Sequence, residues 1–578
     1  MLNTKIVCTL GPSSDGVEEL RGLVDAGMSV ARLNASHGSV DHRETVIERV
    51  REVAETTGKP VATMLDLSGP EIRTAPLDAP VHLEAGSEVR FIKGDTADRR
   101  TIGLSSSIAA VDPGDAVLLD DARIETTVEH VEDGVVFATV DAGGELGGRK
   151  GVNVPGVDLD LDVVTESDRA ELRLAAEAEV DYVAASFVGD ADDVYAIDEV
   201  LESFGGDAPV IAKIERAEAV ENLDDILDAA DGVMVARGDL GVECPLEEVP
   251  IIQKRIIRKA REVGLPVITA TEMLDSMVHS ARPTRAEASD VANAVLDGTD
   301  AVMLSGETAI GDHPVTVVET MVDIVEDVER SDEYTESREK RIPAAADTRT
   351  DALARSARYL ARDVGATAIV AATESGYTAR KVAKYRPAVP VVAVTADRRV
   401  RRQLALYAGI EPHYRPFSQD DGAALIETAA ATALETGVAA SGDTVVVLSG
   451  MMTELEGANT TNTLKVHLAA EVLASGRGIA PGRTFGPVCH APDGDVRDCP
   501  DGSVVVVDDD IDEELTDNLD AIAGIVSAAP DTTSYTATVA RELGVPMVGD
   551  ATLTVGDGEV VTVDGERGVV YASEVAER

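Results

Sequence analysis

Short apolar runs that end in polar residues recur along the first half of the chain. The apolar stretches are continuous rather than alternating, which is typical of parallel strands buried on both faces. Between them, apolar residues such as Val17, Leu20 and Val24 are spaced as in an amphipathic helix. The runs are Lys5–Thr9, Ser29–Asn34, Val61–Asp66, Asp181–Ser186, Val210–Glu215, Gly232–Arg237, Pro266–Thr271 and Asp300–Ser305. Eight such units predict an α/β fold that closes into an eight-stranded β/α (TIM) barrel.

The pattern changes between Asp66 and Leu161, where short alternating segments with many glycines replace the strand–helix repeat. Ala116–Leu119 and Val135–Val140 are examples. Alternation of this kind predicts a small β-barrel domain inserted after the third strand. A domain above the active-site end of a barrel is suited to act as a lid. We expect the barrel at 1–71 and 158–335, and the lid at 72–157.

Two further units are expected after the barrel. The polar stretch Ser331–Lys340 predicts a helix end and a linker. Residues 345–475 alternate helix and strand patterns again, which predicts an open α/β domain with strands at Ala368–Ala372, Pro390–Val394 and Asp443–Leu448. Residues 480–578 are richer in glycine and valine and form a fourth unit.

The charge of the chain excludes several classes of partner. The sequence has 578 residues, with 106 acidic and 51 basic side chains and a formal net charge of −55. Such a surface repels nucleic acid and anionic membranes, so we expect neither as a partner. We find no apolar run of about 18–20 residues and no signal peptide, and therefore expect a cytoplasmic protein.

The acidity also suggests an environment of high salt. Arginine outnumbers lysine, tryptophan is absent and aromatic residues make up 3%. Molar salt shortens the Debye length to about 3 Å and screens most of the repulsion. This composition favours a salt-in halophile over a merely acidic mesophilic protein. The four cysteines, Cys8, Cys244, Cys489 and Cys499, are too few for a disulfide scaffold, and we expect all four to be reduced.

Polar and charged residues gather at the carboxyl ends of the predicted barrel strands, where barrels of this kind place their active sites. They are Asn34, Ser36, Asp66, Lys213, Glu215, Arg237, Asp239, Thr271, Ser305 and Glu307. Two carboxylates, Glu215 and Asp239, suit a Mg²⁺ ion whose coordination is completed by substrate oxygens. Lys213 lies two residues before Glu215, so both side chains face the same way. An ammonium group beside a metal suits phosphoryl transfer, although an ordinary ion pair at a strand end has the same pattern.

The other polar groups at these ends have two interpretations each. Asn34, Ser36 and Asp66 offer oxygen ligands for a monovalent cation, or they cap turns. Gly238 lets backbone amides approach an anion. Thr271 either relays a proton or bonds to the backbone.

At these residues the sequence resembles the pyruvate kinase family. The motifs occur in the family's order and span most of residues 1–475. They are Ala31–Gly38, Leu65–Thr74, Gly151–Gly156, Ala212–Glu215, Val235–Gly241, Thr269–Met277, Arg282–Glu287 and Met303–Thr308. With its acidity, the chain resembles a halophilic archaeal type. The family fold is the barrel, the inserted lid and the C-terminal α/β domain inferred above.

The resemblance implies transfer of a phosphoryl group from phosphoenolpyruvate to ADP, which gives pyruvate and ATP. Glu215 and Asp239 would then hold Mg²⁺ or Mn²⁺. Lys213 and Arg32 would bind the transferring phosphoryl group. The amides of Gly238 and Asp239, with Thr271, would orient the substrate carboxylate, and Thr271 would lie on the route of the proton to the enolate carbon.

Further ligand sets are implied by the same resemblance. Asn34, Ser36, Asp66 and the carbonyl of Leu67 would bind K⁺. Asn34, His37, Arg73 and Lys150 would contact the nucleotide, and the family is usually a homotetramer. Ser68 replaces a lysine common in the family, while Glu71 matches the members that require K⁺.

The turn before a predicted helix at Thr373–Arg380 matches the place where regulated family members bind an effector phosphate. Thr373, Ser375 and Thr378 would be its hydroxyl donors. A capped helix start explains the same residues equally well.

The last unit resembles the mobile phosphohistidine domain of enzymes that use phosphoenolpyruvate. Thr533–Pro546 and Val561–Tyr571 carry the resemblance. Tyr535 stands where that family has its phosphorylated histidine, and tyrosine lacks the imidazole nucleophile. We therefore expect a non-catalytic appendage.

Two other functions remain open from the sequence. One is a different Mg²⁺-dependent barrel enzyme acting on phosphoenolpyruvate or pyruvate, such as an aldolase or lyase. The other is a catalytically idle sensor that binds metabolites through its C-terminal α/β domain.

Overall fold

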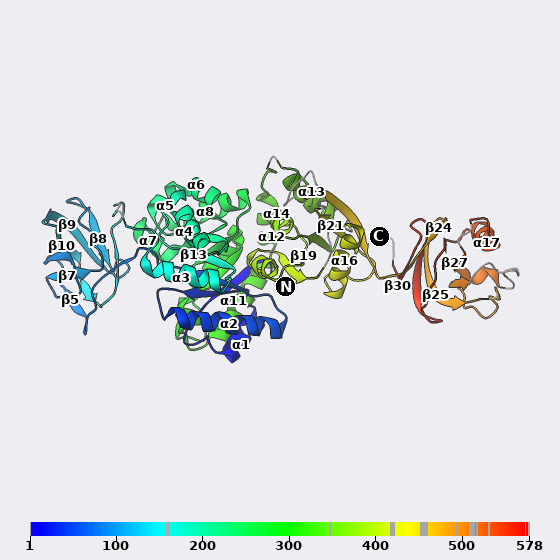
Figure 1. The fold of residues 1–578 in the computed structure, drawn as a ribbon, viewed down its shortest axis with the longest axis horizontal. Coiled ribbons are helices and arrows are strands. Elements are labelled where there is room, and N and C mark those ends of the chain that lie inside the picture. The colour runs from blue at the N-terminus through cyan, green and yellow to red at the C-terminus, as the bar shows by residue number, and fades with distance from the viewer. Residues whose placement is uncertain are drawn as a thin grey trace. The chain divides into compact units, whose positions relative to one another are not determined.

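A computed structural model describes residues 2–157, 159, 161–346, 348–416, 422–450, 461–492, 494–507, 515, 518–529, 532–572 and 574–575. Asp158, the predicted first residue after the lid, lies outside the described residues. The chain divides into two compact units (Figure 1). The first comprises Met1–Ala346, Ala379–Arg386 and Asp397–Tyr414, and the second comprises Asp347–Thr378, Pro387–Ala396 and Arg415–Arg578.

Eight parallel strands of the first unit close into a barrel in the order β1-β17-β16-β15-β14-β13-β3-β2. They are β1 (Lys5–Leu10), β2 (Val30–Asn34), β3 (Ala62–Asp66), β13 (Tyr182–Ala185), β14 (Val210–Ile214), β15 (Gly232–Ala236), β16 (Val267–Ala270) and β17 (Ala301–Leu304). All eight predicted strands are therefore confirmed. Their side chains are almost entirely buried, because the barrel interior covers one face and the helices cover the other.

Helices follow the strands and cover the outside of the barrel. In α8, Ile252, Ile256 and Ala260 are buried while Ile251 is exposed, as amphipathic spacing requires. Helices α1, α2 and α11 lie side by side (Figure 1). The larger helices are α1 (Val17–Ala26), α2 (Val40–Thr57), α3 (Glu166–Glu177), α4 (Ala191–Ser203), α8 (Val249–Val263), α9 (Arg285–Asp297), α11 (Pro314–Glu329) and α12 (Asp332–Lys340). Shorter ones are α5 (Ala217–Glu221), α6 (Leu223–Ala229), α7 (Arg237–Glu243), η1 (Asp275–Val278) and α10 (Gly306–Ala309).

The predicted β lid is inserted between β3 and α3. Seven of its strands form one sheet in the order β4-β12-β8-β9-β10-β6-β7, and β11 pairs with β5. An isolated bridge between Thr74 and Leu104 links the two edges of the larger sheet. The strands are β4 (Ile72–Arg73), β5 (Val81–Leu83), β6 (Glu88–Lys93), β7 (Thr101–Leu104), β8 (Ala116–Leu119), β9 (Ile124–Glu132), β10 (Val135–Ala142), β11 (Gly144–Leu146) and β12 (Gly151–Asn153).

The predicted open α/β domain follows the barrel. In the second unit its strands run in the order β19-β18-β21-β22, with β22 antiparallel to β21. They are β18 (Ala368–Ala372), β19 (Val391–Thr395), β21 (Asp443–Ser449) and β22 (Thr463–Ala469), and the helices are α13 (Arg349–Asp363) and α16 (Gly422–Glu435). Helix α14 (Tyr377–Lys384) spans the two units, and α15 (Arg398–Gln403), η2 (Leu404–Leu406) and β20 (Ile410–Tyr414) belong to the first.

The last part of the chain forms an eight-stranded sheet in the order β23-β30-β29-β25-β26-β27-β28-β24. Its strands are β23 (Val472–Ser475), β24 (Arg477–Ala480), β25 (Arg483–His490), β26 (Ser503–Val507), β27 (Ile522–Ser527), β28 (Met547–Gly549), β29 (Val560–Asp564) and β30 (Val569–Ala572). Helix α17 (Tyr535–Leu543) packs its buried side chains Ala537 and Ala540 on this sheet, and η3 (Leu519–Ala521) precedes β27.

The prediction that all four cysteines are reduced is wrong for two of them. Cys489 and Cys499 form a disulfide with their Cα atoms 5.8 Å apart. The loop after β25 turns back and brings the second cysteine to the end of the strand. Cys8 and Cys244 are free thiols, as expected. In the part of the chain that the structure describes, no helix is long and apolar enough to cross a membrane.

Candidate active site

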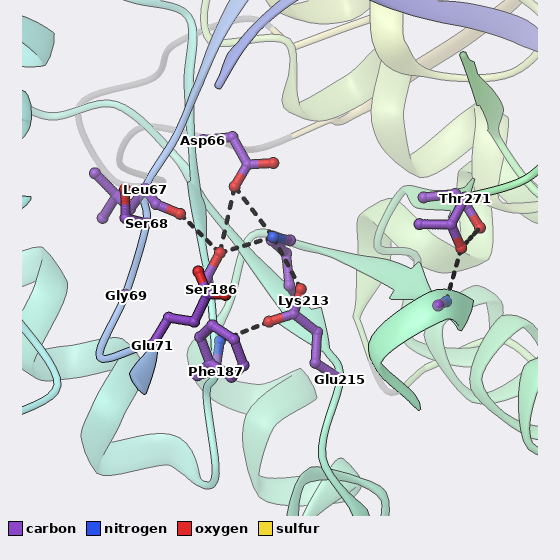
Figure 2. A network of polar contacts seen from close by, with 12 residues as sticks. Asp66, Leu67, Ser68, Gly69, Glu71, Ser186, Phe187, Lys213, Glu215 and Thr271 are labelled. Atoms are coloured by element: carbon purple, nitrogen blue, oxygen red, sulfur yellow. Dashed lines mark hydrogen bonds and ion pairs between the residues drawn. The ribbon is translucent and has the colours of Figure 1, made fainter. Parts of the chain in front are cut away.

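The carboxyl ends of β3, β13 and β14 bring three polar side chains together around Lys213 (Figure 2). The Lys213 ammonium donates to Ser186 Oγ at 2.7 Å and lies 3.2 Å from Asp66 Oδ1 and 2.8 Å from Glu215 Oε1. The predicted common orientation of Lys213 and Glu215 is present. All four side chains follow or end buried strands, so the barrel holds them rigidly.

Arg32 completes this cluster from β2. Its Nε donates to Asp66 Oδ2 at 2.6 Å and its Nη1 donates to Thr9 Oγ1 at 2.9 Å. Asp66 therefore lies between two cations. Burial raises the pKa of Asp66, but Arg32 and Lys213 outweigh this effect and bring the pKa below its usual value. Burial lowers the pKa of Lys213, but Asp66 and Glu215 outweigh it, so the ammonium stays charged.

Glu215 and Asp239 are two carboxylates in an environment that disfavours their charge. Burial raises the pKa of Glu215 to about 7, Lys213 lowers it, and Asp239 raises it again. Burial also raises the pKa of Asp239, as do Glu71 and Asp121, against the effect of Lys213. A divalent cation would relieve this repulsion, so the donor set fits one. Among the described residues, no group of three or more His, Cys, Asp or Glu side chains is suited to hold a metal ion.

Asp239 and Gly238 lie in the first turn of α7, next to Thr271. The Gly238 amide donates to Thr271 Oγ1 at 2.8 Å, and that hydroxyl donates to the Ala270 carbonyl at 2.7 Å. Thr271 is left-handed, with φ +69°, which is costly for a β-branched residue. Arg237 stabilises this turn by donating to the carbonyls of Ala270 and Thr271 at 3.0 and 2.6 Å. In the view of Figure 2, Thr271 stands apart from the Lys213 cluster.

The predicted monovalent-cation ligands lie at the ends of β2 and β3 and in the loops that follow them. Ser36 donates its amide to Asn34 Oδ1 at 3.0 Å and its hydroxyl to Ser68 Oγ at 3.4 Å. The first contact is the turn capping that the sequence left open. The Leu67 carbonyl accepts from Ser186 Oγ at 2.7 Å. Ser186 thus connects the loop after β3 directly to Lys213.

The predicted nucleotide-binding residues are spread over the barrel and the lid. Arg73 donates to Glu71 Oε2 at 2.6 Å, and Lys150 Nζ lies 2.9 Å from Asp120 Oδ1. Asn34 ends β2, and His37 lies in the following loop, where its carbonyl accepts a hydrogen bond from Arg43. The structure does not join these four residues into one cluster.

A cavity of about 230 Å³ lies between the lid and the barrel. Acidic residues dominate its charged lining, among them Glu71, Asp121, Asp239 and Glu243. Asn153 of the lid donates to Glu243 Oε1 at 3.2 Å across this cleft. An acidic cleft favours ligands that carry cations with them.

Sequence reasoning assigned no role to several residues that shape the site. Ser186 joins Lys213, Asp66 and the Leu67 carbonyl, and the Phe187 amide donates to Glu215 Oε2 at 2.7 Å. Asp168 Oδ1 accepts the amides of Ser68 and Gly69 at 3.1 and 3.3 Å. Ser186 ends a predicted strand, so its place was a usable signal. Asp168 stands three residues after Thr165, the spacing of a capping box, but nothing in the sequence connects it to the loop after β3.

The effector candidates surround the start of α14. Thr373 is buried and its amide donates to the Val394 carbonyl at 2.9 Å. Thr378 Oγ1 lies 2.8 Å from Thr461 Oγ1. Ser375 lies in the turn between them. In the last domain, Ser534 caps α17 by accepting the Ala537 amide at 3.2 Å, and Tyr535 is 42% exposed.

Comparison with known proteins finds similarity along nearly the whole chain. Residues 1–318 match the family model "Pyruvate kinase, barrel domain" and 351–467 match "Pyruvate kinase, alpha/beta domain". Residues 500–568 match "PEP-utilising enzyme, mobile domain". The pyruvate kinase of Geobacillus stearothermophilus is 43% identical over 98% of both chains. Those of Bacillus licheniformis and Staphylococcus epidermidis are 41% and 40% identical over 99% of both chains.

Proposed function

Since the chain belongs to the pyruvate kinase family, we propose that it transfers a phosphoryl group from phosphoenolpyruvate to ADP at the carboxyl end of the barrel. The observation that carries this proposal is the Lys213 ammonium, held between Asp66 and Glu215 beside Arg32. A fixed cation in a buried site stabilises negative charge on a phosphoryl group in flight.

Lys213 and Arg32 have the proposed role of binding the phosphoryl group. Arg32 is buried and the Lys213 side chain is only 11% exposed. Their partners hold both cations in place before substrate arrives, so little reorganisation is needed. The hydroxyl of Ser186 positions Lys213 and is itself no ligand of the substrate in this proposal.

Glu215 and Asp239 would hold Mg²⁺ or Mn²⁺. When bound, the ion supplies positive charge that neutralises the phosphoryl and enolate oxygens. The chain itself holds both carboxylates in position to bind the ion. The Phe187 amide orients Glu215, and α7 carries Asp239.

The amides of Gly238 and Asp239, together with Thr271, would orient the substrate carboxylate. The Gly238 amide bonds to Thr271 Oγ1 in the structure, so a carboxylate oxygen would have to compete for this donor. The Thr271 hydroxyl would then be placed to pass a proton towards the enolate carbon.

A K⁺ ion would take Asn34, Ser36, Asp66 and the Leu67 carbonyl as ligands. The hydrogen bond from Ser186 to this carbonyl gives the monovalent site a physical connection to Lys213. Glu71 is consistent with a requirement for K⁺. The nucleotide would be contacted by Asn34, His37, Arg73 and Lys150, and Lys150 would approach through closure of the lid.

Several broader properties belong to the same proposal. The proposed domain bounds are 1–71 and 158–335 for the barrel, 72–157 for the lid, 345–475 for the α/β domain and 480–578 for the last domain. Strand β23, which starts at Val472, belongs to the sheet of the last domain and would move its start to that residue. We further propose a cytoplasmic homotetramer adapted to molar salt, an effector phosphate near Thr373, Ser375 and Thr378, and a last domain without catalysis because Tyr535 replaces histidine.

The testing experiment is a lactate-dehydrogenase-coupled assay in about 2–3 M salt, where screening is complete. KCl is compared with NaCl, each with and without ADP and Mg²⁺. Pyruvate formation that requires ADP, Mg²⁺ and K⁺ together supports the function and both ion sites. Pyruvate released without ADP would indicate a lyase or phosphatase-like enzyme. No turnover in folded protein would favour a metabolite sensor.

A further inference from the structure

Three arginine side chains converge at the end of the barrel opposite to the active site. Arg261 lies on α8, Arg338 lies on α12, and Arg386 follows α14. They line a cavity of about 20 Å³ beside the loop that leads into β17. Gly298, Thr299, Tyr334 and Ser337 complete its polar lining. A cationic pocket is unexpected in a chain with a formal net charge of −55.

The acidic residues around this cavity are already paired, one with Arg386 of the pocket itself and one with a lysine outside it. Asp300 Oδ2 lies 2.7 Å from Arg386, and Asp297 Oδ1 lies 2.6 Å from Lys254. Within the described ranges, neither Arg261 nor Arg338 forms an ion pair with a carboxylate. Arg261 and Arg338 therefore lie in the pocket without a carboxylate in direct ion-pair contact, although Asp300 acts on Arg261 from a greater distance.

The two unpaired guanidinium groups also keep donors without acceptors. The Nε atoms of Arg261 and Arg338 are both buried, and neither has a hydrogen-bond partner among the described residues. Arg261 is only 7% exposed. Burial, with Arg386 and Arg341 nearby, lowers the pKa of Arg261 to about 10 despite the carboxylate of Asp300. Buried charges and donors without partners are costly, so something else should compensate them.

We propose that this cavity binds one small anion, either a halide ion or a phosphate group, between Arg261 and Arg338. The space is about that of one water molecule, which suits a halide without rearrangement. Guanidinium groups also form strong paired hydrogen bonds to phosphate oxygens, and the half-buried Arg338 could move outward to admit them. The Tyr334 ring lies 5.8 Å from the Arg338 guanidinium and supports it.

Such an anion would join elements that are distant in sequence. It would tie α12, the last helix of the barrel region, to α8 and to the loop before β17. By reducing the repulsion between the two arginines, the bound anion would stabilise the folded protein.

The test uses the full-length protein and two probes, potassium bromide and inorganic phosphate. Thermal unfolding is followed while either probe replaces potassium gluconate at constant ionic strength. We expect the thermal unfolding midpoint to rise with the concentration of one probe until the site is saturated. Arg338→Gln should weaken the apparent affinity for that probe about tenfold or more. Bromide located by anomalous scattering in a crystal, or phosphate density, identifies which anion binds.

The control is Arg330→Gln, which removes the same charge from an exposed arginine paired with Glu326. This variant should keep the full response to the anion. Without anion, Arg338→Gln should be at least as stable as the unaltered protein, because it removes repulsion. Equal responses of Arg338→Gln and the unaltered protein would overturn the proposal. So would a loss of stability in Arg338→Gln that is the same with and without anion, since this indicates a structural arginine only.

Discussion

A single ammonium group is the centre of the candidate active site. Lys213 has three polar partners from three strand ends, and two of them are carboxylates. Burial alone would favour the neutral amine, but the carboxylates keep it charged. The same lysine lowers the pKa of Asp66 and opposes the rise in the pKa of Glu215. Loss of this charge would therefore affect the fold and, if the proposed role holds, the reaction.

We expect Lys213→Met to lower kcat by about 10²–10³-fold or more, because it removes a preorganised stabiliser of the phosphoryl group. It should also cost about 3–5 kcal/mol in the free energy of unfolding, since buried Asp66 and Glu215 lose their shared cation. Steady-state kinetics and urea unfolding measure the two effects. Lys259→Met is the matched control, because Lys259 pairs with an exposed Asp224 on the surface. Unchanged activity in Lys213→Met would remove this lysine from the mechanism.

His467 on β22 links stability to pH. Burial, with Lys465 and Arg567, lowers the pKa of His467 to about 4. Between pH about 4 and 6.5 the unfolded chain binds more protons at this site than the folded chain. The free energy of unfolding should therefore fall as the pH falls through this window. His467→Gln should lose less stability than the unaltered protein between pH about 7.5 and 5, as measured by urea midpoints. The control is His279→Gln, because the His279 side chain is 81% exposed. Its stability should depend on pH in the same way as that of the unaltered protein.

At the scale of elements, the start of α3 holds the loop that follows β3. Thr165 and Asp168 form a capping box, in which Asp168 Oδ2 accepts from Thr165 and Thr165 accepts the Asp168 amide. The other oxygen of the same carboxylate accepts the amides of Ser68 and Gly69. One helix cap therefore positions the loop that carries the Leu67 carbonyl.

We expect Asp168→Ala to cost about 1–2 kcal/mol of stability through loss of the cap. It should also raise the K⁺ concentration needed for half-maximal activity, because the loop after β3 is no longer held. Glu287→Ala removes the equivalent residue of the α9 capping box and should cause a similar loss of stability. If both variants shift the K⁺ requirement equally, the loop is not controlled by Asp168.

The last domain has its own cross-link between β25 and the following loop. Alkylation of the unfolded, unreduced protein should label Cys8 and Cys244 but not Cys489 and Cys499. Prior reduction should make all four reactive and lower the stability of the last domain by about 3 kcal/mol, since the closed loop is short. Peptide mass spectrometry reads the labels. Labelling of Cys489 without reduction would restore the original prediction of four thiols.

At the scale of the whole molecule, the excess of acidic side chains dominates. A formal net charge of −55 produces repulsion among surface carboxylates that only dissolved ions can screen. The Debye length is about 3 Å at 1 M salt and about 10 Å at 0.1 M. The same charge makes the cationic pocket around Arg261 and Arg338 stand out from the rest of the protein.

Lowering KCl from about 3 M to about 0.1 M should therefore lower the thermal unfolding midpoint substantially. NaCl at the same ionic strength should protect the fold equally well, because screening does not distinguish the two cations. Activity, in contrast, should distinguish them if K⁺ binds near Asp66. A protein that is equally stable at both salt concentrations would contradict adaptation to molar salt.

The sequence by itself determined the kinds of element, the closed barrel and the place of the site. These depend on local patterns, since buried strands have continuous apolar runs and the chemistry stands at their carboxyl ends. Lys213 and Glu215, two residues apart at the end of one strand, were therefore predictable as neighbours.

Only the tertiary structure decided which other groups contact and position the residues of the candidate site. Ser186 contacts Asp66 across 120 positions, and Asp168 reaches Gly69 across 99. Arg261 and Arg338 share a pocket although they lie on separate helices, and Cys499 returns to Cys489 through a loop. Such contacts follow from how distant segments pack together, and no local pattern around one residue identifies its distant partner.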